Sequence, residues 1–258
     1  MTYLKMAKSP CLKRLRLSRA TITELCALTQ DDLHPWGNIG HGVPVALRVT
    51  AAVNFYAASS FQGSTGDVCS ISQAATHYYI KDVKNALQKR TGEFIRFWMD
   101  EDNQVGWAMG FIAISIFPCV QSVIDCTHAA IKAPSKLPAP FINRKGFYSL
   151  SVKLIYDHKK QILQVCARYP GSNHDAYVFQ HSQMPQSFMP RPHIRELIKG
   201  DSGYPFHTWV MVLVRNPVRQ KRVNAIQGTT RNIIEPIISL LKMRFCCLDL
   251  GVHSSTTQ

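Results

Sequence analysis

Four acidic residues of this chain stand where their carboxylates could meet. Asp125, Asp175 and Asp201 each come where the apolar run of a predicted strand stops. Acids in that position point from the edge of an open α/β sheet into the crevice where such sheets bind ligands. Glu235 lies on a helix predicted near the C-terminus, and it would bring a fourth carboxylate to the same place.

Grouped carboxylates repel one another and raise each other's pKa, and a hard divalent cation with oxygen ligands relieves that repulsion. We therefore expect Mg²⁺ or Mn²⁺ as the cofactor of these residues. Two such ions about 3.5 to 4 Å apart activate a water molecule and stabilise the leaving oxygen in phosphodiester cleavage. The pattern thus favours metal-dependent cleavage of a phosphodiester.

A structural role is the alternative for each acid taken singly. An aspartate at a strand end is more often a turn former or a helix cap. Asp175 follows a Gly-Ser-Asn run, and it could simply cap a helix that begins at Ala176. Asp157 lies in a predicted hairpin turn, and we assign it to the turn outright.

The stretch 230–245 places Glu235 among basic residues on a predicted helix. Arg231 and Lys242 lie four residues before it and seven residues after it, so all three side chains share one side of a helix. A surface ion pair between Arg231 and Glu235 is the alternative interpretation. Pro236 follows the acid directly, and a proline inside a helix costs about 3 kcal/mol. The helix must therefore restart at Pro236 or kink at Glu235.

The second half of the chain is predicted to form a mixed α/β sheet. Residues 122–133, 147–158 and 161–171 are rich in Val, Ile and aromatics and predict strands, the last two joined as a hairpin through Lys159 and Lys160. A short helix near 175–182, strands near 196–201 and 208–214, and the final helix follow. Strands that then alternate with helices indicate a mixed α/β class.

The first half is predicted to be helical and to bind DNA. Helices are expected near 17–33, 44–58 and 70–90, with Ser18 or Thr21 as one cap and Ser70 with Gln73 as another capping box. A short element and a turn before the third helix resemble a helix-turn-helix. Lys81 and Lys84 would then face DNA, although a purely structural helical bundle fits the pattern equally well. On that third helix we expect an interrupted apolar stripe through Ile71, Ala74, Tyr78, Val83 and Leu87. A polar, broken stretch places the domain boundary near residue 100, giving domains 1–100 and 101–258.

The charge of the chain favours an acidic partner. Thirty Lys and Arg against 16 Asp and Glu leave a net charge of +14, and residues 1–20 form a basic arm without any acid. Nucleic acid is the first partner such an excess indicates. The eight irregularly spaced cysteines indicate reduced thiols rather than disulfides or a zinc site. Residues 105–124 are uncharged over a membrane-span length, but Pro118 and Gln121 interrupt them, and we expect a helix running into a buried strand.

The combination of motifs resembles one known family. The segments VIDCTHAAIKAP, ARYPGSNHDAYVF, GDSGYP and TRNIIEPIISLLKMRF are similar, in this order, to the Harbinger transposase-derived nucleases, relatives of the IS5-type DDE transposases. The resemblance implies an RNase H-like catalytic domain whose acidic triad is Asp125, Asp201 and Glu235. It also implies that Asp175 contacts metal and that Arg231 and Lys242 grip phosphate.

Further expectations follow from the same resemblance. It implies a DNA endonuclease that works with a Myb-like partner protein and is found in the nucleus and also in the cytoplasm. The chain begins later and stops sooner than the family pattern, so we expect terminal pieces to be missing. These ends and Pro236 favour the alternative of a domesticated relative that binds DNA without cutting it, whereas the intact acids favour the nuclease.

Overall fold

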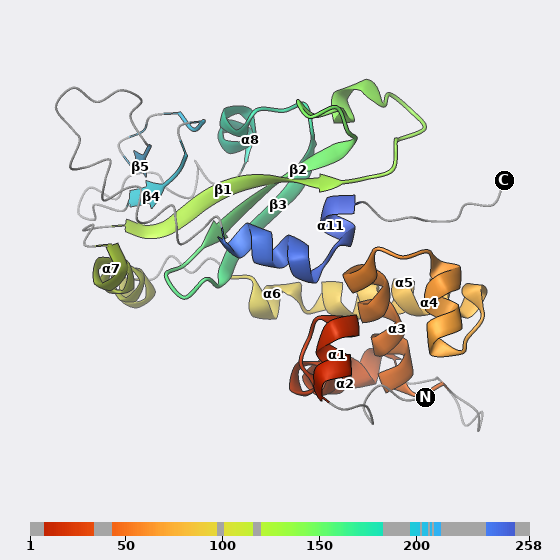
Figure 1. The fold of residues 1–258 in the computed structure, drawn as a ribbon. Helices are drawn as coiled ribbons and strands as arrows, with labels where there is room; N and C mark the ends of the chain where they lie inside the picture. The colour runs from red at the N-terminus through yellow and green to blue at the C-terminus, as the bar shows by residue number, and fades with distance from the viewer. Residues whose placement is uncertain are drawn as a thin grey trace. The chain divides into compact units, whose positions relative to one another are not determined.

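The computed structural model describes residues 8–33, 43–96, 101–115, 120–182, 197–201, 203–205, 207, 209–212 and 236–250. The chain forms two compact units, which Figure 1 shows as a group of helices and a sheet with its own helices. The helical unit comprises Met1–Phe94, Ala130–Lys132 and Leu241–Gln258, and the sheet unit comprises Ile95–Ala129 and Ala133–Leu240. The helical unit therefore includes a segment from far along the chain.

Helix α3 is the centre of the helical unit. It runs over Val45–Ala58, is buried on almost every side, and contacts helices on all sides. The other helices of this part are α1 Lys8–Leu15, α2 Arg19–Leu33, α4 Gln62–Cys69, α5 Gln73–Lys89 and α6 Thr91–Phe94. The small α11, Cys247–Leu250, also contacts α3. The helices expected from sequence in this half are therefore present, and their role in DNA binding stays a prediction.

The caps of two helices separate the alternatives left by the sequence. Ser18 Oγ accepts a hydrogen bond from the Thr21 backbone N–H at 3.1 Å, so Ser18 caps α2. The expected cap of α5 at Ser70 is wrong, because Ser72 Oγ accepts from Ala75 N–H at 3.1 Å. Ser70 instead ends α4 in the left-handed conformation, with φ 57°. Two serines two residues apart left the sequence without a local signal to choose between them.

The buried stripe of α5 also differs from the expected one. The residues that face the core are Thr76, Ile80, Val83 and Ala86, at helical spacing. Tyr78, expected in the stripe, is 61% exposed, because its ring lies on the opposite side of the helix from Ile80. The outward face of α5 consequently carries Tyr78 together with Lys81 and Lys84, which are both exposed.

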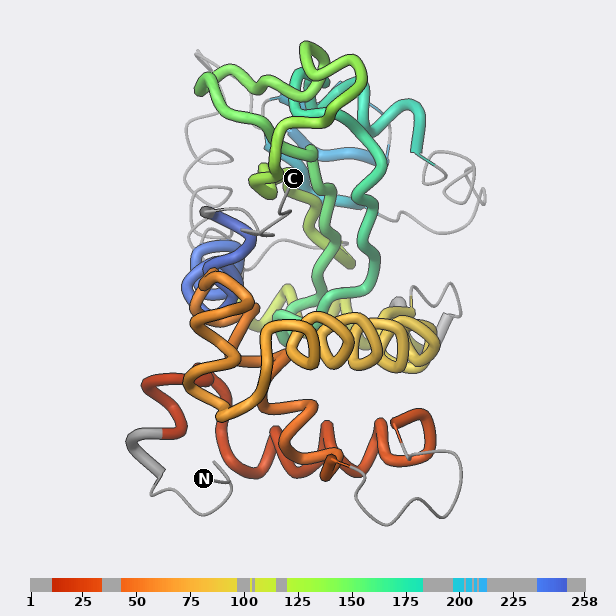
Figure 2. Tube along the Cα trace, turned by 90° about the vertical axis from the view of Figure 1, so that its right-hand side faces the viewer, coloured from red at the N-terminus to blue at the C-terminus, as the bar shows by residue number. Residues whose placement is uncertain are grey.

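The sheet has five strands in the order β3-β2-β1-β4-β5. Strands β2 (Ser149–Tyr156) and β3 (Ile162–Pro170) are antiparallel, as the predicted hairpin requires, and Figure 2 shows them side by side, joined by a tight turn. Strand β1 (Val120–Ala130) is parallel to β4 (Leu197–Lys199), which is parallel to β5 (Val210–Met211). This mixed α/β sheet fits the expected RNase H-like class.

The turn between β2 and β3 confirms the structural role assigned to Asp157. Its Oδ1 accepts a hydrogen bond from Gln161 N–H at 2.8 Å, and the side chain is buried. Lys160 completes the turn with a positive φ of 67°. Asp157 is therefore occupied inside the hairpin.

Helix α7, Glu101–Ser115, precedes β1, and the two account for most of the long uncharged stretch of the sequence. Trp107 of α7 packs with Ile124, Ile155, Phe179 and Ile198 in the core of the sheet unit. Within the described part of the chain, no helix has the length and apolarity needed to cross a membrane. A helix followed by a buried strand is what the sequence predicted for this stretch.

Candidate active site

The pairing of two parallel strands brings the segments that carry Asp125 and Asp201 next to each other. Val123 of β1 pairs with Lys199 of β4, and each aspartate lies two residues further along its own chain. Neighbouring strands are about 4.8 Å apart. Asp201 follows the last residue of β4, as expected, but Asp125 is the sixth of the eleven residues of β1, so the expectation that it ends a strand is wrong.

Burial changes along β1 at the first of these acids. The strand is buried from Val120 through Ile124 and half-buried from Asp125 onwards. The apolar half anchors the strand in the core, and the acid is the first side chain to leave it. The Asp125 carboxylate also accepts a hydrogen bond from the next backbone N–H, that of Cys126, at 2.8 Å.

Asp201 follows a glycine that a close aromatic ring requires. A Cβ on Gly200 would lie 2.9 Å from the ring of Tyr204, which a real side chain could not tolerate. The Tyr204 backbone N–H donates to the carbonyl of Asp201 at 3.1 Å and closes a turn. That turn carries the tyrosine hydroxyl back to the Sγ of Cys126, 3.1 Å away.

Asp175 reaches the same place from a helix. Its helix, α8 (Asp175–His181), has His174 as its N-cap residue, so Asp175 is the first helical residue and not the cap. A Cβ on Gly203, two residues after Asp201, would lie 3.5 Å from the Asp175 Oδ2. The turn that follows Asp201 therefore lies close to the carboxylate of Asp175.

The pKa values of Cys126 and Tyr204 are both affected by the negative charges of the nearby acids. Burial raises the pKa of Cys126, and the negative charges of Asp175 and Asp125 raise it further. Burial also raises the pKa of Tyr204, with the same two carboxylates contributing. Cys126 therefore stays a neutral thiol beside the acids in the metal-free chain. The available donors are carboxylate oxygens, which suit hard cations such as Mg²⁺ or Mn²⁺.

The remaining predicted residues are placed less fully. Glu235 and Arg231 lie outside the described residues, as does the step from Glu235 into the helix at 236–244. Within the described ranges, no group of three or more His, Cys, Asp or Glu side chains is arranged to hold a metal ion. Lys242, expected to grip phosphate, forms an ion pair with Asp249 at 3.1 Å. Lys81 and Lys84 lie exposed on α5.

The sequence reasoning missed Cys126 and Tyr204 as parts of this site. Cys126 adjoins the first acid, and Tyr204 ends the G-D-x-G-Y segment, so both were visible in the quoted motifs. Their contact joins two segments 78 residues apart. A signal for that pairing would have required knowing that β1 and β4 are neighbours.

Comparison with known proteins assigns the family. The sequence pattern of the family described as "DDE superfamily endonuclease" matches residues 124–258, a range that holds all four predicted acids. The chain belongs to this family. It is 35% identical over 204 residues to the human protein named "Putative nuclease HARBI1", covering 78% of this chain and 58% of that protein.

Other relatives agree with this assignment. The Xenopus laevis protein of the same name is 31% identical over 204 residues, covering 78% of this chain and 59% of its own length. An Arabidopsis thaliana protein named "Protein ALP1-like" is 23% identical over 218 residues, covering 76% and 52%. The resemblance to Harbinger-derived nucleases is thereby confirmed. The chain spans 52–59% of the length of these relatives. No solved structure matches it.

Proposed function

We propose that this chain carries the catalytic part of a divalent-metal-dependent DNA endonuclease. The observation that carries the proposal is the parallel pairing of β1 with β4, because Asp125 lies in the first strand and Asp201 two residues after the second. Two carboxylates on adjacent parallel strands, within a family of endonucleases, suit phosphodiester hydrolysis better than a structural role.

Each residue of the proposed site has a distinct part. Asp125, Asp201 and Glu235 would hold two Mg²⁺ or Mn²⁺ ions, with Asp175 as a further contact. Bound in such a site, the ions supply an activated water and stabilise the leaving oxygen. The chain's own residues orient the acids: the Cys126 N–H fixes one oxygen of Asp125, and the Tyr204 N–H fixes the backbone at Asp201.

DNA is the proposed substrate because of the charge of the chain. The excess of 14 positive charges favours a polyanion, and Lys81 and Lys84 present two of them on the outward face of α5. Arg231 is proposed to contact phosphate. Lys242 can do so only by leaving Asp249. A Myb-like partner protein, and residence in the nucleus and the cytoplasm, belong to the same proposal.

The proposal is tested by nicking of supercoiled duplex DNA in Mg²⁺ or Mn²⁺. Asp125→Asn should reduce the nicking rate on the order of 10³-fold or more, because it removes a charge that holds the metal. Asp157→Asn is the matched control, since it makes the same change in a turn of the same unit and keeps the oxygen that accepts from Gln161. Equal nicking by wild type and Asp125→Asn would contradict the mechanism.

A second function is a DNA-binding protein that does not cut. The observation that favours it is Pro236, which is exposed, directly follows Glu235 and stands at the start of the described helical residues 236–244. If the chain direction at the proline turns Glu235 away from the other acids, an error of about 1 Å costs on the order of 10²-fold in rate. Wild-type protein that binds duplex DNA but leaves it uncut in both metals would support this second function.

A further inference from the structure

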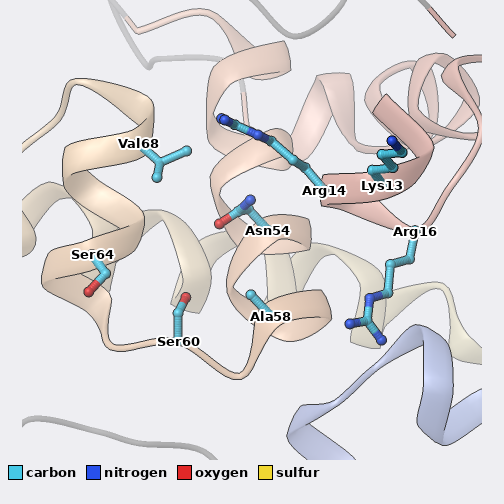
Figure 3. A pocket seen from close by; sticks show the side chains of 8 residues that line it. All are labelled: Lys13, Arg14, Arg16, Asn54, Ala58, Ser60, Ser64 and Val68. Atoms are coloured by element: carbon cyan, nitrogen blue, oxygen red, sulfur yellow. The ribbon is translucent and has the colours of Figure 1, made fainter. Parts of the chain in front are cut away.

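A basic pocket opens in the helical unit between α1, α3 and α4. Its volume is about 280 Å³, and Figure 3 shows its lining side chains on those three helices, with Arg14 extending towards Val68 and Asn54 while Lys13 and Arg16 point in other directions. Lys13 and Arg14, from the last turn of α1, and Arg16, just after it, bring three positive charges. None of the described residues that line the pocket is acidic. The pocket therefore concentrates one sign of charge.

These three cations are not neutralised by the residues that the structure describes. Lys13 and Arg14 are exposed and form none of the ion pairs found there. Arg16 is held differently, because its guanidinium donates to the carbonyl of Met243 and lies 3.0 Å from the Sγ of Cys246, both in the same unit. Those partners carry no formal negative charge, so they fix Arg16 in place and leave its positive charge uncompensated.

A buried amide in the same pocket has no protein partner. Asn54 of α3 is only 7% exposed and lines the wall of the pocket, and its side chain makes no hydrogen bond to any part of the chain that is described. The amide is therefore free to donate to a ligand that enters the pocket.

The start of α4 adds further donors. Phe61 is the N-cap residue of this helix and supplies no capping hydrogen bond from its side chain. Ser60 and Ser64 line the pocket on either side of this first turn, and the Ser60 hydroxyl shares a hydrogen bond with Thr65 Oγ1 at 2.9 Å. A Cβ on Gly63, between them, would meet nothing within 4 Å, so the turn is open. Unpaired N–H groups at a helix start attract anions.

We propose that this pocket binds one backbone phosphate of DNA. Ammonium, guanidinium, amide, hydroxyl and helix N–H groups together form a set of donors, and a phosphate offers only acceptor oxygens and negative charge. The choice of DNA as the source of the phosphate rests on the proposed endonuclease function. The phosphate site itself rests on the pocket alone, and it anchors the helical unit to the duplex backbone without reading sequence.

Duplex binding in a chelator tests the proposal without any cleavage. Affinity for a fluorescent duplex is measured by anisotropy in EDTA at several salt concentrations, for wild type and Arg14→Gln. The variant should bind about 10-fold more weakly, because it loses a charge-assisted contact. The matched control is Arg19→Gln, the same change on an exposed residue of α2 outside the pocket, which should stay within about 2-fold of wild type. Equal losses in both variants would mean a diffuse basic surface and would overturn the pocket.

The dependence of DNA affinity on salt concentration measures how many phosphates the protein contacts. Log affinity falls with log salt by about 0.9 for each phosphate contacted. Lys13→Gln combined with Arg14→Gln should reduce that slope by about 0.9 if both residues hold the same phosphate. A reduction near twice that value would indicate two separate surface contacts and overturn the single site. Both side chains are exposed, so folding should survive, which thermal unfolding checks.

Inorganic phosphate separates the two sources of the anion. It should raise the thermal unfolding midpoint of wild type and not that of Arg14→Gln. If it does so while the two proteins bind DNA equally, the pocket takes a free phosphate and the DNA assignment is overturned. If wild type fails to bind any duplex, the proposed endonuclease function fails with it. If wild type binds and Arg14→Gln binds equally well, only the pocket inference fails.

Discussion

The acidic edge of the sheet unit and the basic pocket of the helical unit gather charge in opposite ways. Asp125 stands where burial decreases along β1 and Asp201 just after β4, next to a thiol and a phenol that burial keeps neutral. The cations Lys13 and Arg14 stand exposed at the end of a short helix, around an open cavity. Half-buried carboxylates favour binding of a divalent metal ion that has lost some of its water ligands. Exposed cations favour binding of a polyanion, and that binding weakens as salt is added. The two regions should therefore respond to different experiments.

The largest expected effect is on the nicking rate, and it should differ between Asp201 and Asp175. Asp201→Asn should lower the metal-dependent nicking rate on the order of 10³-fold, because Asp201 is a proposed metal ligand and follows β4, the strand that pairs with the one carrying Asp125. Asp175→Asn should cost roughly 10- to 100-fold, as outer contacts of a metal site do, since Asp175 approaches from α8. Single-turnover nicking measures both. Neither change should alter duplex affinity in EDTA, and a Mg²⁺-independent loss of binding would show that the acidic edge is not a metal site.

An intermediate effect compares the basic pocket with the outward face of α5. Replacing both Lys81 and Lys84 by Gln should weaken duplex binding and reduce the salt slope by about 1.8, because the two exposed lysines are spaced to reach separate phosphates. The pocket pair Lys13 and Arg14 should lose only about half as much slope. The measurement is anisotropy against salt in EDTA. An unchanged slope would remove α5 from the DNA contact and leave the helix a structural role.

The smallest effect concerns a cation of the sheet unit that takes no part in binding. Lys153 of β2 is fully buried, and its Nζ donates to Ser182 Oγ at 2.6 Å. Burial lowers the pKa of Lys153 below its ordinary value of 10.5. The unfolded chain then binds more protons than the folded one between the lowered pKa and 10.5, so this group's contribution to stability rises with pH across that window.

Lys153→Met should therefore be more stable than wild type by about 1 kcal/mol at neutral pH, because no charge is then buried. The difference should shrink as pH rises towards 10.5. Chemical denaturation at several pH values measures it, and the exposed Lys159→Met is the control, for which the difference should stay flat. DNA affinity should be the same in both variants. A Lys153→Met protein that loses DNA affinity while remaining folded would make Lys153 a ligand-binding cation.

Elements with strong local signals were predictable from the sequence. The β2–β3 hairpin followed from two apolar runs separated by a short polar turn, and α3 followed from its length and its proline start. The face of α5 was not predictable in the same way. Tyr78 and Ile80 are both apolar and only two residues apart, and the buried Thr76 gives no apolar signal. Packing against α3 determines which face of α5 is buried, and the sequence of α5 alone does not reveal that contact.

The candidate site was predictable only in part, for a similar reason. The end of an apolar run marks both Asp125 and Asp201 in the sequence, but only Asp201 follows the end of its strand, because β1 continues past Asp125 to Ala130. Their neighbourhood depends on the pairing of β1 with β4 across more than 70 residues, which no local pattern records. The contact of Cys126 with Tyr204 follows from that pairing and was missed with it. The grouping of 241–258 with the helical unit is another pairing of distant segments without a local signal.

The hydrogen bond from Arg16 to the carbonyl of Met243 can form only after the C-terminal part of the chain has been synthesised. The guanidinium also meets Cys246, 230 positions later, and α11 then contacts α3. At about 5–20 residues per second, a ribosome needs roughly 10 to 50 s to make the second partner after the first. Until then the surface of α3 that receives α11 stays uncovered. The helical unit, although its first residues are translated first, therefore completes its packing only after all residues of the sheet unit have been synthesised.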